Sequence, residues 1–204
     1  MAEQKKVRRN PFVGTKFSSG KAEFEARIGA IEKNLASAVI SGSVHTVDYL
    51  PYAVRHLAAD TTVELMQSSD AKNVGITNVN KRQLEANTYA LCTGIQLLEA
   101  KFEKSAPTEA EIKSASFGVI SSDIANGELE VKNGDKILYP RSSCEVFRTT
   151  DSESLQGYHA LECPKFFIPL TDIIPTLYVP ASTQGENKSK AIKIVFHCVK
   201  TNKA

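Results

Sequence analysis

The strongest constraint on this fold is a hairpin signal in the second half of the chain. Asn133-Gly134 separates two segments whose side chains alternate between apolar and polar, Gly127 to Lys132 and Asp135 to Tyr139. Both residues of an Asn-Gly pair tolerate positive φ, which favours a tight turn between antiparallel strands. Residues 191–199 also alternate with a period of two. The region from 116 to 204 is therefore predicted to be β-rich.

Short β-prone runs separated by prolines follow the hairpin. Prolines between short strands are typical of β-sandwiches or barrels with edge strands and irregular corners. The sequence thus favours an antiparallel β-sandwich or barrel, and a jelly roll is one form that it could take. The runs are Cys144 to Thr149, Tyr158 to Cys163, Phe166 to Leu170 and Thr176 to Val179, and the prolines are Pro140, Pro164, Pro169, Pro175 and Pro180.

Helical periodicity dominates the first half of the chain. Apolar residues three and four apart form one stripe before Gly42, and residues 44–50 form a short strand candidate. A second helix is predicted to open at Pro51 and to extend to about residue 65. A third is predicted between Lys81 and Lys104, with Asn80 as its N-cap and apolar residues on more than one side. The first stripe consists of Phe24, Ile28, Ile31, Leu35 and Val39.

Helices and strands are thus segregated along the chain, which predicts an α+β fold rather than a doubly wound parallel sheet. We expect N-terminal helices packed on a C-terminal antiparallel β-sandwich or barrel. The expected organisation is a basic extended arm at 1–20, a mainly helical region at 21–115 and a β-rich region at 116–204. Residues 21–204 are expected to form one compact domain.

Composition bounds the class of protein. The chain has 204 residues, of which 42% are apolar and 24% charged, as in ordinary globular proteins. Its apolar runs are shorter than the roughly 18 residues of a membrane helix, and its charged start does not resemble a secretory signal. Synthesis in a cytoplasm is the expectation. Four widely spaced cysteines are predicted to be buried thiols: Cys92, Cys144, Cys163 and Cys198.

The charge is concentrated at the N-terminus. Five basic residues against Glu3 alone give residues 1–20 a net charge of +4, so the rest of the chain carries −2 of the total of +2. An arm of this kind can bind phosphate backbones, dock on a neighbouring subunit, or act as an inert solubilising tail. The candidate contact residues for nucleic acid or another subunit are Lys5, Lys6, Arg8, Arg9 and Lys16.

Catalytic, cofactor and metal motifs are weak. The segment from Gly14 to Lys21 has five residues between its glycines and Ala22 after the lysine, whereas a phosphate-binding loop needs four and then Ser or Thr. His159, Cys163, His197 and Cys198 lack a Cys-x-x-Cys knuckle, and adjacent strand residues point to opposite faces. We therefore expect no catalytic residues, no cofactor and no metal.

Three functional hypotheses remain. A basic arm, a near-neutral body and proline-punctuated β-runs form a combination that resembles viral and phage shell proteins at the level of class. The first hypothesis is a self-assembling structural protein, such as a capsid or nucleocapsid subunit, found in a virion and partnered by copies of itself. The second is a nucleic-acid-binding accessory protein that uses the arm. The third is an enzyme whose site the sequence does not reveal.

Overall fold

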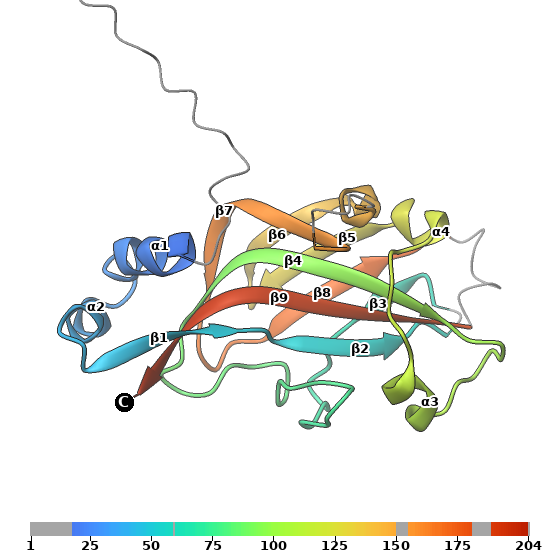
Figure 1. The fold of residues 1–204 in the computed structure, drawn as a ribbon, viewed down its shortest axis with the longest axis horizontal. Coiled ribbons are helices and arrows are strands. Elements are labelled where there is room, and N and C mark those ends of the chain that lie inside the picture. Colours follow the sequence, from blue (N-terminus) through green and yellow to red (C-terminus); the bar gives the residue numbers. More distant parts are fainter. Residues whose placement is uncertain (1–17, 59, 150–154, 181–188, 204) are drawn as a thin grey trace, which may run out of the picture.

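Two antiparallel sheets form the centre of the computed structural model, which describes residues 18–58, 60–149, 155–180 and 189–203 (Figure 1). Sheet A has the order β1-β9-β4-β7, and β2 also pairs with β9. Sheet B has the order β3-β8-β5-β6. Sheet A contains β1 (Val44–Tyr49), β2 (Tyr52–His56), β4 (Ala90–Lys101), β7 (Tyr158–Phe167) and β9 (Lys190–Lys203). Sheet B contains β3 (Thr62–Glu64), β5 (Glu128–Asn133), β6 (Lys136–Ser143) and β8 (Ile173–Tyr178).

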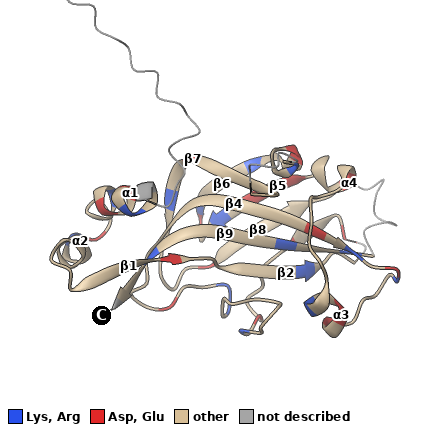
Figure 2. Cartoon of the chain, viewed as in Figure 1, with Lys and Arg blue, Asp and Glu red and all other residues tan. Residues whose placement is uncertain are grey.

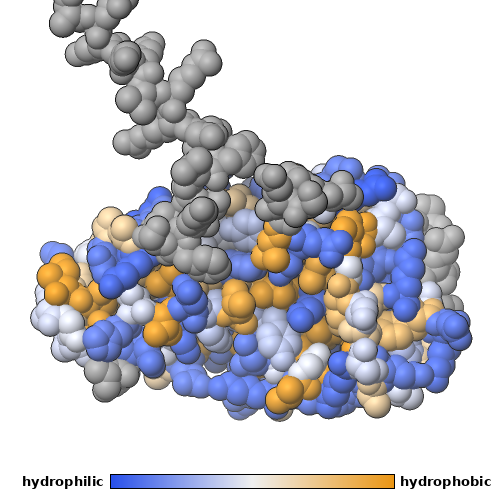
Figure 3. All heavy atoms as spheres, in the orientation of Figure 1, coloured by the Kyte–Doolittle hydropathy of each residue, from blue (hydrophilic) through white to orange (hydrophobic). Residues whose placement is uncertain are grey.

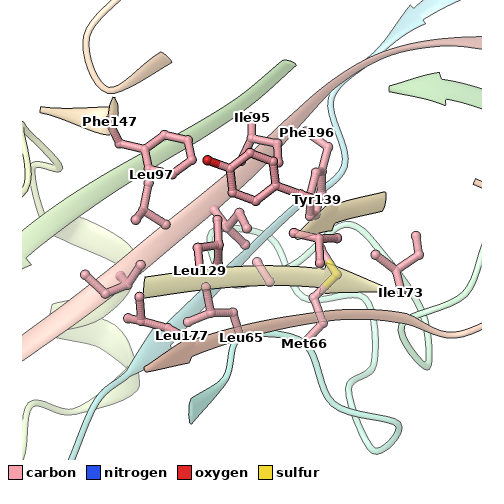
Figure 4. Packing of buried hydrophobic residues seen from close by; sticks show 14 of the residues in the cluster. Leu65, Met66, Ile95, Leu97, Leu129, Tyr139, Phe147, Ile173, Leu177 and Phe196 are labelled. Atoms are coloured by element: carbon pink, nitrogen blue, oxygen red, sulfur yellow. The ribbon is translucent and has the colours of Figure 1, made fainter. Parts of the chain in front are cut away.

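The two sheets share one apolar core. Ile95 and Leu97 of β4 belong to the same buried cluster as Leu129 of β5 and Leu177 of β8 (Figure 4). Phe196 of β9 is fully buried in this cluster as well. Because a strand directs alternate side chains to opposite faces, one face of each sheet supplies this core.

Short helices lie outside this core. α1 (Ser18–Ile28) and α2 (Lys33–Ile40) contribute to a second apolar cluster on the outer face of sheet A. Phe24 of α1 is fully buried there, with its ring 5.1 Å from that of Phe166. The remaining helices are α3 (Glu109–Ser114), α4 (Ser122–Ala125) and the 3₁₀ helix η2 (Cys144–Phe147). Within the described residues, none of the helices has the length and apolar character needed to cross a membrane.

Several sequence predictions are confirmed. Asn133 ends β5 and Lys136 begins β6, and Gly134 between them has a φ of +57°. Residues 44–49 form strand β1, and the run at 191–199 lies within β9. A mixed helix and strand fold with antiparallel sheets is therefore correct at that level.

The helix predicted between Lys81 and Lys104 is wrong, because residues 90–101 form β4 in sheet A. β4 pairs with β7 on one side and β9 on the other, and both of its faces are largely covered. A strand buried on both faces has no period of two, so its apolar coverage looks like that of a buried helix. Alanine, leucine, glutamate and glutamine are also good helix formers, which strengthened the wrong prediction.

Two smaller predictions are also wrong. The helix expected from Pro51 is replaced by β2 and β3, consistent with the β-branched residues Thr61, Thr62 and Val63. The strand expected at Cys144 is instead η2, whose first turn is capped by the Ser143 hydroxyl. The helical layer expected over 21–115 therefore reduces to α1, α2 and α3 within the described residues.

Candidate functional site

The basic arm lies outside the described residues, and so do all five of its predicted contact residues, Lys5, Lys6, Arg8, Arg9 and Lys16. What the structure gives is the place where the arm joins the body. A Cβ atom on Gly20 in α1 would come within 3.0 Å of Val199 Cγ2 and 3.9 Å of Thr93 Cγ2. The chain therefore enters the fold over the centre of sheet A, where β4 and β9 pair.

A buried polar cluster closes one end of the core. Glu99 of β4 and Lys190 of β9 follow the alternation of the core residues on their strands, so their side chains point between the sheets. The side chains of Glu99 and Lys190 are only 2% and 3% exposed. Ser121, the N-cap residue of α4, and Asp123, in the first turn of α4, complete the cluster.

Hydrogen bonds connect these four residues in a chain. Glu99 Oε2 accepts from the Ser121 backbone N–H at 2.7 Å and from the Ser121 hydroxyl at 2.6 Å. Lys190 Nζ donates to Ser121 Oγ at 3.4 Å and forms an ion pair with Asp123. The hydrogen bond from Lys190 lowers the pKa of Asp123 and keeps its carboxylate ionised. Glu99 Oε1 has no hydrogen-bond partner within the described residues and lies 3.9 Å from Lys101 Nζ.

This arrangement joins sheet A to α4 by charge rather than by apolar contact. Sequence reasoning missed it, because the four residues come from three separate segments. The available signal was Glu99 in the otherwise apolar run from Leu97 to Ala100. A charged residue on the core face of a strand needs a partner, and Lys190 at the start of the alternating run at 191–199 was the candidate.

The histidines and cysteines considered for metal binding do not converge. His159 lies near the rings of Tyr139 and Phe147, with centroids 6.0 and 5.8 Å away. His197 instead packs 4.8 Å from the ring of Tyr158. The described residues contain no group of three or more His, Cys, Asp or Glu side chains placed to hold a metal ion.

All four cysteines are free thiols, but one burial prediction is wrong. Cys92, Cys144 and Cys198 are buried, and burial raises the pKa of Cys144 to about 12. Cys163 is exposed, beside Pro164 in the edge strand β7. Its neighbours in sequence had suggested a buried position, whereas its place at the sheet edge leaves it open to solvent.

The two histidines give a testable pH dependence. Burial lowers the pKa of both His159 and His197 below 6.5, so the folded protein binds fewer protons than the unfolded chain. The contribution of these two histidines to the free energy of unfolding should therefore be constant above about pH 7 and fall as the pH drops through 6 towards 5. Urea unfolding at pH 7.5 and 5.0 measures this difference.

The control is a double variant, His159→Gln with His197→Gln, which should show a smaller fall over the same range. Ion-paired carboxyl groups such as those of Asp123 and Asp172 do not contribute to the difference in stability between pH 7.5 and 5.0. Their pKa values are lowered from 3.8, so their contribution is lost only below about pH 4. An identical fall in the double variant would contradict the assignment to these histidines.

Two shallow hollows lie beside α1 and α2. The larger has a volume of about 300 Å³ and is lined by Glu32, Asn34, Leu35, Ala38, Asn87 and Tyr89. The smaller, about 130 Å³, lies next to the ion pair between Lys21 and Glu25. Neither brings together a nucleophile, a base and an orienting group, which nucleophilic catalysis would require.

Comparison with known proteins does not assign this chain to a family. The chain matches no protein-family model, no curated protein and no solved structure.

Proposed function

We propose that this chain is a structural protein that assembles with copies of itself into a shell, as a viral or phage capsid or nucleocapsid subunit does. The observation that carries the proposal is the strand order of the two sheets. β1 and β2 pair with β9 in one continuous register, since Tyr49 is opposite Cys198 and Tyr52 is opposite Val195. They can therefore be counted as one interrupted strand.

With that count the described residues form eight strands, ordered 1-8-3-6 in sheet A and 2-7-4-5 in sheet B. Strands from the two ends of the chain alternate as neighbours, which is the order of a jelly roll with two Greek keys. Jelly rolls are found in viral capsid domains, lectin domains and cupins. The fold alone does not choose among these functions.

The basic arm favours the shell over the other jelly-roll functions. The arm has a net charge of +4 and the rest of the chain has a net charge of −2. Because the positive charge is concentrated in one short segment, the arm can bind an acidic surface of a neighbouring subunit or a packaged polyanion. In the described body many basic side chains are already paired with carboxylates, such as Arg82 with Glu64 and Arg141 with Glu128. Figure 2 shows the same mixture, with basic residues (blue) and acidic residues (red) interspersed over the body.

The arm also supports the second candidate, a nucleic-acid-binding accessory protein. In that case the arm supplies most of the affinity for RNA or DNA through phosphate contacts, and the body needs no self-association. Neither of these two candidate functions requires a catalytic step in this protein. They differ in oligomeric mass, and the shell proposal alone places the mature protein in a virion after cytoplasmic synthesis.

The deciding experiment is the mass distribution of the purified protein in solution, with and without added nucleic acid. The shell proposal predicts discrete species many times larger than the 22.3 kDa chain, populated more strongly with RNA or DNA. Analytical ultracentrifugation and electron microscopy would measure both mass and regularity. A protein that stays monomeric but binds nucleic acid supports the accessory role. One that stays monomeric and binds nothing contradicts both.

A further inference from the structure

The edge formed by β1 has backbone groups that point away from the sheet and that have no partner among the described residues. Phe196 N–H donates to the Pro51 carbonyl, and Leu57 N–H donates to the Lys190 carbonyl. The register of β1 and β2 on β9 is continuous, so odd-numbered residues direct their N–H and C=O groups towards β9. Even-numbered residues direct theirs outward.

The outward groups near β2 are already satisfied by the chain itself. Val54 N–H donates to the Ile76 carbonyl at 2.7 Å, and Tyr52 N–H donates to Asn78 Oδ1 at 2.8 Å. The Leu50 carbonyl accepts from Asn78 Nδ2 at 2.8 Å. The outward groups of Val44, Thr46 and Asp48 have no such partner among the described residues.

The other sheet edges have features that oppose pairing. β7 contains Pro164 and β6 contains Pro140, and proline removes a donor from an edge. β3 has only three residues. β1 has six residues and no proline, and it lies at the margin of sheet A beyond β9 (Figure 1). An open edge of this kind is a template for another strand.

We propose that β1 pairs antiparallel with β1 of a second copy across a two-fold axis, joining two A sheets into one. This inference rests on the proposed function, since it names one contact of the assembly. A second copy is the favoured occupant because two-fold antiparallel pairing makes the edge complementary to itself: every outward donor meets an outward acceptor.

The hydrogen-bond pattern also selects the register. With the axis at Thr46, Thr46 pairs with its symmetry mate and Val44 pairs with Asp48 of the other copy, so all three outward residues of each copy take part. With the axis at Val47, Val44 would be opposite Leu50, whose carbonyl already accepts from Asn78. The Thr46-centred register is therefore favoured.

Exposed apolar side chains accompany this edge. Ile40, at the end of α2, is 79% exposed, and Val47 and Leu50 are 36% and 47% exposed. Hydrophobic side chains appear in several patches on the face of the molecule drawn in Figure 3. A six-residue strand pair is smaller than a standard stable interface, so each contact is weak and gains strength by repetition in a larger assembly.

The test is Asp48→Pro in the full chain. Asp48 is exposed and its N–H points away from β9, so proline removes an outward donor and leaves the fold intact. Self-association, measured by sedimentation over a range of protein concentrations, should weaken about tenfold or more, because two donors are lost at each two-fold contact. The matched control, Asp48→Ala, keeps the amide and should associate like the wild type.

Hydrogen exchange gives a second measurement that does not depend on the variant. The amides of Val44, Thr46 and Asp48 should be protected in the assembled protein and should lose that protection on dilution. If the wild type assembles while Asp48→Pro associates equally well and these amides exchange freely, the β1 contact is wrong and the shell proposal stands. If the wild type never self-associates, both are wrong. Loss of association in Asp48→Ala as well would assign the effect to the side chain and overturn the backbone pairing.

Discussion

Replacing Lys190 with methionine should lower the free energy of unfolding by about 3–5 kcal/mol, a large part of the roughly 5–15 kcal/mol that stabilises a typical domain. The change removes the ammonium that neutralises Asp123 and that reaches Glu99 through the Ser121 hydroxyl. Glu99 would remain a buried carboxylate, and within the described residues its contact with a cation would be the ion pair with Lys101 at 3.9 Å. Urea unfolding followed by fluorescence or circular dichroism measures the loss.

A double-mutant cycle tests whether the cluster acts as one unit. Glu99→Gln removes the buried negative charge and keeps an oxygen that can accept from Ser121. The double variant Lys190→Met with Glu99→Gln should be more stable than the sum of the two single losses predicts, by about 0.5–3 kcal/mol. Additive losses would mean that Glu99 and Lys190 do not interact through Ser121, and the cluster would then be two separate contacts.

Deleting residues 1–17 should abolish the large assemblies and leave the fold unchanged. The first described helix starts at Ser18, and its buried anchors Phe24 and Ile28 pack against Leu91 and Val199. The thermal midpoint should therefore stay within a few degrees of the wild-type value. Because the β1 edge remains, the truncated protein should sediment as a dimer at high concentration. An unchanged mass and unchanged nucleic acid affinity would show that the arm is inert.

Two variants of the full chain separate the possible acceptors of the arm. Replacing Lys5, Lys6, Arg8 and Arg9 with glutamine removes charge and keeps the apolar residues, whereas Phe12→Ser with Phe17→Ser does the reverse. Phosphate binding should be lost in the first, and its affinity should fall with salt with a log–log slope no steeper than about four. Docking on a protein surface should be lost in the second and should respond weakly to salt.

The amino-acid sequence by itself determined the local features of this fold. The hairpin follows from Asn133-Gly134 because the turn needs a positive φ at Gly134. The alternation at 191–199 identifies a strand because alternate side chains face opposite sides of the sheet. The charge of the arm is likewise a property of the sequence alone. Each of these signals depends on residues that are close together in the chain.

The tertiary structure alone decided what depends on distant residues. β4 is a strand because β7 and β9 bond to its two edges while Leu91 packs on α1 and Ile95 on sheet B. Because both faces of β4 are covered, its sequence lacks the alternation of apolar and polar residues on which a strand prediction relies. Glu99, Ser121 and Lys190 meet only because the end of β4, the start of β9 and the N-terminus of α4 lie together. The edge of β1 also depends on folding. In the described part of the chain its outward groups lack partners because β9 lies on the other side and the segment at 73–78 bonds to β2 and Leu50 but not to β1.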